Sequence, residues 1–517
     1  MLKKIDTQHS WKESLVALTQ KDVIHMMLLG FSAGLPLLLI FSSLSLWLGE
    51  AGIQKSAVTY FSWAALGYSF KFVWAPLVDS LPVPYLTRML GLRRSWLLVS
   101  QILIIAAISI MALTDPALEN QLIYMALGAV LLGFSSATQD ISIDAYRIEA
   151  VGADMQAIMS SGYMAGYRIG MIVAGAGALY LASYFGTTKE QYVYESWKMT
   201  YHIMSLFMLV GVLATFLITE PIKREKEFNH TAKEYLGLVF TFFISVCAFI
   251  ACFVLTSEVS GTMKSGLTGI VHSQSLAGLF VEILRLAGAI GVSLTVAKFI
   301  ISTRFVSQRL IQHSYISPVK QFFDDYGRST AWLLLALIGL YRISDIVLGV
   351  ISNLFYQDMG YTKNEIADAV KLFGLIMTLV GGFLGGILAM RYGVMRILFL
   401  GALLVVVTNL FFITLVYSGH NLAMLYAVVS MDNLVAGISS AAFIAFLSSL
   451  VNFQFTAMQY AIFSSLMTLV PKALAGYSGS IVDSLGYVPF FVIASCIGLP
   501  ILYLVYLANK KLKLQPL

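Results

Sequence analysis

The chain has 517 residues, of which 58% are hydrophobic and only 12% are charged. Soluble domains carry about 25% charged residues, so this composition excludes an ordinary soluble globular protein and predicts an all-α polytopic membrane protein. The net charge of +6 does not indicate a nucleic-acid partner, because its distribution follows the two sides of a lipid bilayer. The three cysteines lie in apolar runs without metal-ligand spacing.

A polar segment at residues 1–23 precedes the first apolar run. That run is too long for a signal-peptide core and no small-residue cleavage site follows it, so we interpret it as an uncleaved first span. Apolar runs long enough to cross a hydrocarbon core of about 30 Å recur along the chain. The sequence predicts fourteen transmembrane helices, at residues 24–47, 56–78, 96–114, 121–146, 157–185, 199–219, 233–255, 276–301, 331–355, 366–390, 395–417, 421–451, 459–484 and 488–508.

Lysine and arginine are unevenly distributed between the short loops on the two sides of these spans. Most of them lie on the side that holds both ends of the chain, including the segment at 220–230 and the tail at 509–517. Because cytoplasmic loops carry the excess of positive residues, we expect both termini in the cytoplasm. The only long polar-amphipathic stretch, at 302–330, favours a helix lying on the cytoplasmic membrane face over a regulatory domain.

Three pairs of stretches repeat in the same order along the chain. "APLVDS" followed by "GLRRSW" matches "GGILAMRYGVMRIL", and both resemble the G-x-L-x-D-R-x-G-R-R loop of the major facilitator superfamily, although Met390 replaces the acid in the second copy. "LWLGEAGIQKSAV" matches "LFYQDMGYTKNEIA", and "AIMSSGYMAGYR" matches "AIFSSLMTLVPK". Parallel repeats are typical of transporters. We therefore predict two six-helix halves, at 24–219 and 331–508, joined by a linker at 220–330 that contains an extra helical pair.

The third repeat places two cations at equivalent positions. Arg168 and Lys472 each lie eleven residues into their copy, roughly 16 Å along the helix and near the bilayer midplane. Ionisable residues at this depth usually face a bundle interior or an aqueous cavity. We therefore predict that both line one central cavity and bind substrate, with Arg342 as a further candidate. For Arg342 the alternative is a structural ion pair with Asp345 at i+3.

Four stretches, "GFSAGLPLLL", "FKFVWAPLVDS", "GLRRSWLLVSQ" and "SSATQDISIDAYRIE", resemble the AmpG muropeptide permeases of Gram-negative inner membranes. The likeness is densest over residues 24–185. This resemblance implies proton-coupled import of anhydromuropeptides (GlcNAc-1,6-anhydro-MurNAc peptides) from periplasm to cytoplasm, peptidoglycan recycling and a role in β-lactamase induction. Acetyl-coenzyme A transporters share parts of these motifs, so an organic-anion facilitator of that kind is the alternative.

A muropeptide carries several carboxylates, and a basic cluster at the midplane is the expected complement. Tyr163 and Tyr167 precede Arg168 on the same helix and could pack on a sugar face or bind its hydroxyls. Ordinary packing between helices is the alternative for both tyrosines.

Asp140, Asp144 and Arg147 fall at i, i+4 and i+7 and therefore share one face of a helix. Two interpretations are open: a conformational latch near the cytoplasmic end, or a site at which Asp140 or Asp144 carries the coupled proton. The latch would be a charge relay that also includes Asp79, Arg93 and Arg94. Asp345 and Asp432 lie deeper and are alternative proton carriers.

Two other classes of function fit the sequence less well. A membrane enzyme should show a cluster of histidine, cysteine or paired acids near one interface, but the seven histidines are scattered and no P-loop or metal motif is present. A transporter-like sensor would usually add a soluble output domain. We therefore predict a secondary transporter that needs no cofactor or metal besides the proton gradient; the sequence predicts no oligomeric state.

Overall fold

The structure is a computed structural model and describes residues 13, 16–53, 68, 70–118, 120–152, 155–188, 191–221, 232–271, 274–303, 308–475 and 478–514. At some helical positions it describes the main chain without the side chain. Two compact units make up the chain. The larger contains Met1–Val78, Pro82–Ile222 and Phe322–Leu517, and the smaller contains Asp79–Leu81 and Lys223–Gln321. The larger unit therefore includes both repeat halves.

The N-terminal half consists of helices in its described parts. These are α2 (Lys21–Ile40), α3 (Ser42–Glu50), η2 (Lys71–Val73), α6 (Ala75–Ser80), α7 (Leu86–Leu90), α8 (Leu92–Ala112), α9 (Leu122–Ala150), α10 (Gln156–Ile172), η3 (Val173–Gly177), α11 (Ala178–Tyr184), α12 (Tyr194–Phe207) and α13 (Leu209–Leu217). The π-helical turn η3 continues α10 directly into α11, so these three elements form one membrane-length segment.

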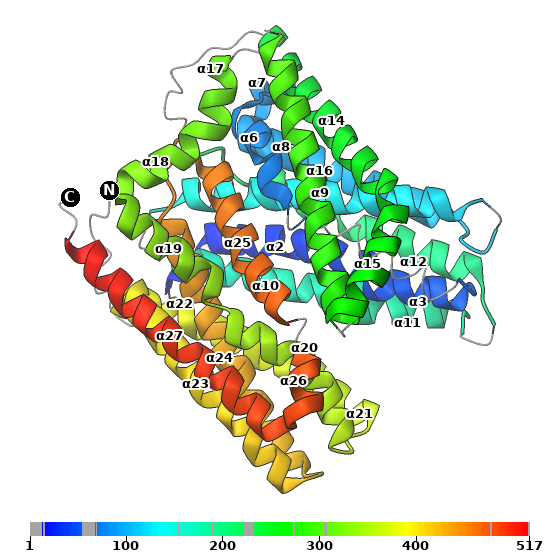
Figure 1. The fold of residues 1–517 in the computed structure, drawn as a ribbon, viewed down its shortest axis with the longest axis vertical. Helices are drawn as coiled ribbons and strands as arrows, with labels where there is room; N and C mark the ends of the chain where they lie inside the picture. Colours follow the sequence, from blue (N-terminus) through cyan, green and yellow to red (C-terminus); the bar gives the residue numbers. More distant parts are fainter. Residues whose placement is uncertain are drawn as a thin grey trace. The chain divides into compact units, whose positions relative to one another are not determined.

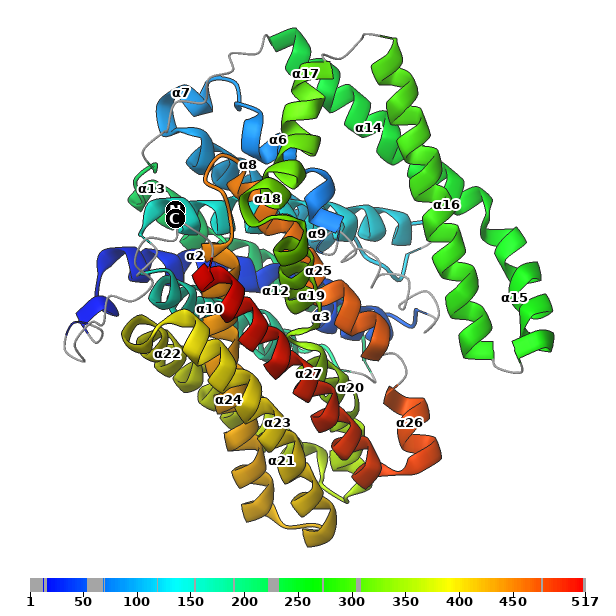
Figure 2. The ribbon, with the colours of Figure 1, turned by 60° about the vertical axis from the view of Figure 1, so that its left-hand side comes forward.

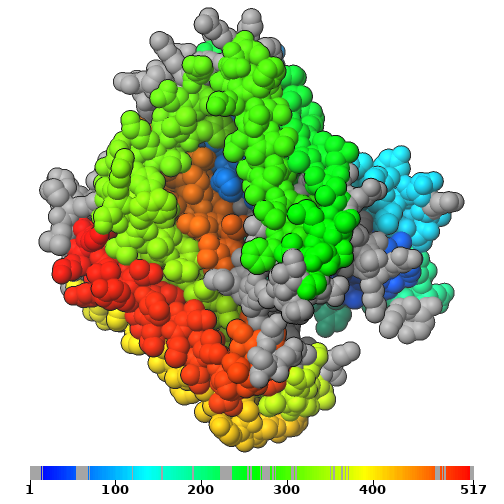
Figure 3. Space-filling view, in the orientation of Figure 1, coloured from blue at the N-terminus to red at the C-terminus, as the bar shows by residue number. Residues whose placement is uncertain are grey.

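The C-terminal half repeats this all-helical organisation. Its elements are α19 (Arg328–Leu340), α20 (Ile343–Asp358), α21 (Lys363–Ile366), η5 (Ala367–Phe373), α22 (Gly374–Tyr392), α23 (Val394–Ser418), α24 (Leu422–Ser449), α25 (Thr456–Ala475), α26 (Ser478–Leu485) and α27 (Tyr487–Leu514). The last helix, α27, packs along α19 and α23 (Figure 1). In the space-filling view α27 (red) covers one face of this half beside the yellow segments (Figure 3).

The smaller unit contains the predicted extra pair. Its elements are α14 (Ala232–Leu255), α15 (Ser257–Val271), α16 (Gln274–Ser302), α17 (Gln308–Ile311) and the π-helical η4 (Gln312–Ile316), and α18 (Ser317–Tyr326) then leads into the larger unit. Helices α14 and α15 both pack against α16 (Figure 2). Helix α15 lies between the two predicted extra spans, in a stretch where the sequence predicted no span; a helix satisfies its own backbone groups at the membrane. Within the predicted amphipathic segment at 302–330, α17, η4 and α18 follow one another without a gap from Gln308 to Tyr326; the location of this segment on the membrane face stays a prediction.

Ten helical segments in the described part of the chain are long and apolar enough to cross a membrane. They coincide with ten of the fourteen predicted spans. Residues 236–252 and 287–302 form shorter apolar helices within the extra pair. The predicted span at 56–78 falls largely outside the described residues, and the one at 459–484 is divided between α25 and α26 at residues 476–477, which are not described. The count of fourteen stays a prediction.

Glycines bring α2 and α10 into backbone contact. A Cβ added at Gly34 would collide with the carbonyl oxygen of Tyr167, and one at Gly166 would collide with that of Met27. The glycines of this interface recur every four residues on each helix, at Gly30 and Gly34 on α2 and at Gly162, Gly166 and Gly170 on α10. Small residues at this spacing let membrane helices approach closely. The position of α10, which carries Arg168, is therefore fixed by α2.

A second glycine-rich contact joins α22 to α24 in the C-terminal half. Added Cβ atoms at Gly381 and Gly437 would collide with backbone atoms of the facing helix. Helix α10 packs on both α22 and α24, and the Ser161 hydroxyl donates a 2.8 Å hydrogen bond to the Gly382 carbonyl oxygen. The two tightly packed helix pairs thus form one of the contacts between the halves.

Candidate functional site

The predicted acidic face of α9 is buried within the protein. Asp140 and Asp144 are each 7% exposed, and Arg147 is fully covered. They share one face because their i, i+4 and i+7 spacing follows the helical repeat. Buried charges must be paired or hydrogen-bonded, so the partners of these three side chains show how the site works.

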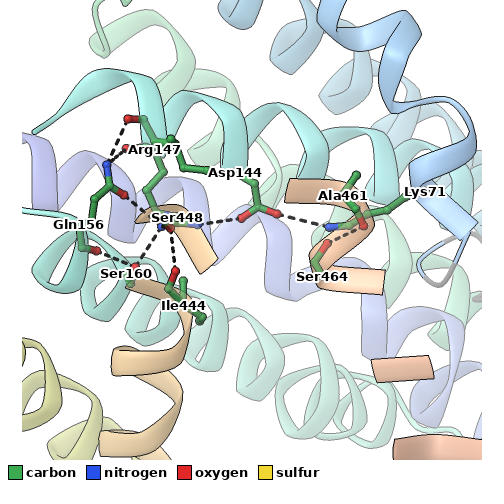
Figure 4. Close-up of polar contacts among 10 residues, drawn as sticks. Lys71, Asp144, Arg147, Gln156, Ser160, Ile444, Ser448, Ala461 and Ser464 are labelled. Carbon is green, nitrogen blue, oxygen red and sulfur yellow. Dashed lines mark hydrogen bonds and ion pairs between the residues drawn. The ribbon is translucent and has the colours of Figure 1, made fainter. Parts of the chain in front are cut away.

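Asp144 lies between two cations (Figure 4). The Lys71 Nζ atom is 3.3 Å from one carboxylate oxygen, and an Arg147 guanidinium nitrogen is 3.5 Å from the other. The side chains of Lys71 and Asp144 are only 8% and 10% exposed. The negative charge of Asp144 is therefore matched on both sides in a dry environment.

Arg147 also joins the two repeat halves of the chain (Figure 4). Its Nη1 atom donates to the hydroxyls of Ser160 on α10 and Ser448 on α24, at 3.1 and 2.7 Å. The same nitrogen contacts the Gln156 side-chain oxygen at 3.4 Å. The guanidinium lies 5.1 Å from the ring centroid of Tyr460 on α25. One arginine of the N-terminal half is thus bound to two helices of the C-terminal half.

Asp140 has a different environment, one turn before Asp144. Its Oδ1 atom is buried without a hydrogen-bond partner among the described residues, while its carboxyl group interacts with Tyr163 on α10 through a hydrogen bond. Lys71 and Tyr68 lie within electrostatic range of it. Asp140 is therefore the acid of this pair that is not fully paired.

The three arginines of the predicted relay have different partners. Arg93 binds Glu149 through two hydrogen bonds of 2.6 and 2.9 Å, and Arg94 binds backbone carbonyls near the end of α13 at 3.0 and 3.2 Å. Arg147 binds Asp144 instead. The reason is helical geometry: Glu149 follows Asp144 by five residues, about 140° around the helix. Arg93 and Arg147 therefore bind acids on different faces of α9, and the predicted relay that also includes Asp79 stays a prediction.

The predicted residues Asp79 and Lys472 lie in helices α6 and α25. Asp79 lies in α6 and is 5% exposed. The main chain of Lys472 belongs to α25, but its side chain lies outside the described residues. The prediction that Lys472 and Arg168 share one cavity therefore stays a prediction.

The first span of the C-terminal half is broken where Arg342 lies. Helix α19 ends at Leu340 and α20 begins at Ile343, and an Arg342 guanidinium nitrogen is 2.9 Å from an Asp345 oxygen. These side chains keep 28% and 27% of their surface exposed. They line a pocket together with Tyr341, Ser344, Ala436 and Ser439. The ion pair considered for Arg342 is present, and it faces a pocket.

Two further predicted residues carry charge near this pair. Arg168 on α10 is within electrostatic range of Arg342 and Asp345, and its Nε atom is buried without a hydrogen-bond partner in the described structure. Asp432 on α24 is within electrostatic range of Asp345. The structure therefore places Arg168 of one half within electrostatic range of Arg342 of the other, and their binding of substrate stays a prediction.

The two tyrosines of α10 lie between these charge clusters. Their ring centroids are 6.0 Å apart. Tyr163 is hydrogen-bonded to Asp140, and Tyr167 lies within electrostatic range of both Asp140 and Arg168. Tyr163 therefore makes a hydrogen bond in addition to its packing between helices, and Tyr167 interacts electrostatically with charged groups.

Lys71 is the main residue that the sequence interpretation missed, together with Tyr68 and Tyr460. It lies inside the predicted span at 56–78, and a lysine within an apolar run is itself the signal of a functional or paired charge. The two tyrosines had no such signal, because aromatic residues in membrane helices most often serve packing.

Comparison with known proteins identifies the superfamily and a group of relatives. Residues 23–318 match the family model described as the Major Facilitator Superfamily. A Rickettsia felis protein named transporter AmpG 4 is 31% identical over 484 residues, which cover 94% of this chain and 95% of that protein. The anhydromuropeptide permease of Escherichia coli K12 is 27% identical over 489 residues, which cover 94% of this chain and 80% of that permease.

Solved structures show the same fold. The Escherichia coli fucose:proton symporter FucP aligns with a TM-score of 0.58 at 11% identity, covering 97% of this chain and 99% of that chain. The proton:xylose symporter XylE aligns with a TM-score of 0.56 at 12% identity, covering 96% of each chain. At such low identity the likeness supports the arrangement of helices alone.

Proposed function

Because the chain belongs to the major facilitator superfamily and, within it, to the AmpG transporters, we propose that it imports anhydromuropeptides, GlcNAc-1,6-anhydro-MurNAc peptides, from periplasm to cytoplasm. The chain is a multi-pass membrane transporter and not an enzyme. The assignment of this substrate rests on the similarity to the Escherichia coli anhydromuropeptide permease along 94% of the chain. The proposal places the protein in the inner membrane, with cytoplasmic termini, in peptidoglycan recycling and in the supply of ligands that control β-lactamase induction.

The substrate in this proposal binds between the halves at Arg168 and Arg342. These cations come from different halves and lie within electrostatic range of each other. Arg342 lines a pocket at a broken helix, and discontinuous helices commonly form transporter binding sites. A guanidinium offers planar, bidentate hydrogen bonding to a carboxylate, which a peptide-bearing sugar supplies.

The coupled proton is carried by Asp140 in this proposal. Asp144 already has two cationic partners, whereas Asp140 has a buried oxygen without a hydrogen-bond partner in the described structure. A buried carboxyl group in that position can take up a proton without breaking an ion pair. Tyr163 and Tyr167 then connect the proton site to the substrate site along α10. No cofactor besides the proton gradient is needed.

Arg147 is the latch of the transport cycle. The orientation inferred from the loop charges puts this end of α9 at the cytoplasm. Here Arg147 holds α24 and α25 of the other half through Ser448 and Tyr460. Release of substrate into the cytoplasm requires these contacts to break, so alternating access passes through the loss of the Arg147 contacts.

The test is uptake in proteoliposomes that contain the purified protein. Labelled anhydromuropeptide should accumulate when the interior is alkaline relative to the exterior and only equilibrate without a pH gradient. Asp140→Asn should abolish gradient-driven accumulation but retain exchange of labelled for unlabelled substrate, whereas Glu195→Gln, at an exposed surface pair, should behave as wild type. Uptake of acetyl-coenzyme A instead of muropeptide would favour the alternative facilitator and contradict the proposal.

A further inference from the structure

The charged side chains around the broken helix balance one another. Arg168 and Arg342 supply two positive charges, and Asp345 and Asp432 supply two negative charges, among the side chains that the structure describes. A site for a purely anionic ligand should carry an excess of cations. The described side chains thus offer partners for both signs of charge; the count does not include Lys472, whose side chain lies outside them.

The Arg342–Asp345 pair is free to exchange partners. A single hydrogen bond of 2.9 Å joins the two side chains, and each is more than a quarter exposed. Lys71 and Asp144, by contrast, are 8% and 10% exposed. Solvent-exposed ion pairs contribute little stability, so a ligand that offers a carboxylate to Arg342 and an ammonium to Asp345 can replace the internal pair at low cost.

The broken span prepares the pocket for such a ligand. The break at Tyr341 and Arg342 brings the first turn of α20 to the pocket, because Ser344 and Asp345 both line it. A helix N-terminus favours negative charge, which helps to hold Asp345 or a ligand carboxylate. Tyr341 is held in place by its hydroxyl, which donates to the Leu398 carbonyl oxygen at 2.9 Å, so the wall beside Arg342 is rigid.

We propose that this pocket is part of a subsite for a zwitterionic group, with Arg342 binding its carboxylate and Asp345 binding its ammonium. Arg168 and Asp432 do not line the pocket but lie within electrostatic range of this pair and add one charge of each sign. The inference rests on the proposed function, in which that group is a stem-peptide residue bearing a free ammonium beside a free carboxylate. Asp345 and Asp432 then serve substrate recognition, and proton transfer is left to Asp140.

The experiment compares the uptake kinetics of three labelled substrates in proteoliposomes. They are an anhydromuropeptide whose stem peptide ends in a diamino acid, its N-acetylated derivative, and the peptide-free anhydrodisaccharide. N-acetylation removes the ammonium charge, although it also adds an acetyl group, and should raise KM about tenfold or more, the expected size for loss of a charged hydrogen bond. Asp345→Asn and Asp432→Asn should raise KM for the first substrate and abolish the discrimination against the acetylated one.

Asp358→Asn is the matched control, since Asp358 lies on the same helix α20, is exposed and does not line the pocket. This variant should keep the full discrimination. Equal KM values for the free and acetylated substrates in the wild type would overturn the zwitterion subsite while leaving muropeptide import intact. Absence of uptake for all three substrates would overturn the proposed function and the subsite with it. Binding measured by thermal stabilisation of the purified variants separates loss of recognition from loss of folding.

Discussion

The two charge clusters of the transporter differ in burial more than in composition. In the N-terminal half, Asp144 is enclosed by Lys71 and Arg147, and these side chains are at most 10% exposed. In the C-terminal half, Arg342 and Asp345 also form an ion pair, but each is more than a quarter exposed and faces a pocket. Both clusters contain an Arg–Asp pair at i,i+3.

The difference shows how similar residues can serve different steps of transport. A buried, multiply bonded charge is costly to separate because the unpaired charge remains desolvated. It therefore suits a latch that must hold one conformation. A partly exposed pair, such as Arg342 and Asp345 at 28% and 27%, is held more weakly and suits a site that gives its bonds to a ligand. Substitutions in the buried cluster and in the partly exposed cluster should therefore have different effects.

The largest effect is expected for Arg147→Gln. This change leaves Asp144 with a single cationic partner and removes the contacts to Ser448 and Tyr460. Breaking a buried pair costs about 3 kcal/mol, or about 100-fold in a conformational equilibrium. We expect uptake to fall about 100-fold while the protein still inserts into the membrane.

Lys198→Gln provides the control for Arg147→Gln. Lys198 also forms an i,i+3 pair, with Glu195, but the two side chains are 30% and 66% exposed. Uptake should stay at the wild-type rate in this variant. A wild-type rate in Arg147→Gln as well would remove the latch from the mechanism.

The next effect concerns the helix that connects the two clusters. Gly166→Ala places a methyl group against the Met27 carbonyl oxygen and the backbone of Phe31, so α10 must move away from α2. Overpacking of this kind costs about 1–3 kcal/mol. Because α10 carries Ser160, Tyr163 and Arg168, both clusters should be disturbed, and we expect a lower melting temperature together with reduced uptake.

Gly269→Ala tests whether the cost comes from helix contact. An added Cβ at Gly269 meets nothing within 4 Å, so the melting temperature should stay unchanged or rise slightly, since alanine favours a helix over glycine. Equal destabilisation by both changes would show that the α2–α10 contact has no special role.

The sequence predicted the charged face of α9 because period and spacing are local properties. Ten spans followed from hydropathy for the same reason. The sequence did not predict that Glu149 is a partner of Arg93. This pairing depends on how α8 and α9 rotate against each other, which is fixed by packing over the whole half.

The partners of Arg147 in the other half could not be predicted from the sequence either. Ser448 and Tyr460 lie about 300 residues from Arg147 in sequence, and serine and tyrosine in apolar helices have common packing roles. Lys71 was different, since its charge inside a predicted span was a usable signal. Residue type therefore identified candidate charges, while their partners could be found only from three-dimensional contacts.

A moderate effect on KM is expected for Arg168→Gln, which changes the cluster that contains the partly exposed Arg342–Asp345 pair. Loss of one guanidinium should raise KM for anhydromuropeptide about tenfold and leave the melting temperature near that of the wild type, because the Nε atom has no hydrogen-bond partner among the described residues. Arg168→Lys should restore only part of the affinity, since lysine lacks the planar fork. An unchanged KM in Arg168→Gln would exclude this residue from the substrate site.

The smallest effect is expected at a pair outside the spans, between Glu365 and His420. Their atoms are 3.0 Å apart, and His420 is 47% exposed. The hydrogen bond with His420, and after it the one from the Thr362 amide, holds the pKa of Glu365 below its usual value of 4.5. A depressed carboxyl pKa stabilises the folded state above pH 4.5, and this contribution is lost as the pH falls through the folded-state value. Glu365→Gln should therefore lower the melting temperature by less than about 2 °C at pH 7, and the difference should shrink on acidification below pH 4.5. A difference that grows at low pH, or a loss of uptake as large as that of Arg147→Gln, would show that exposure does not separate weak pairs from strong ones in this protein.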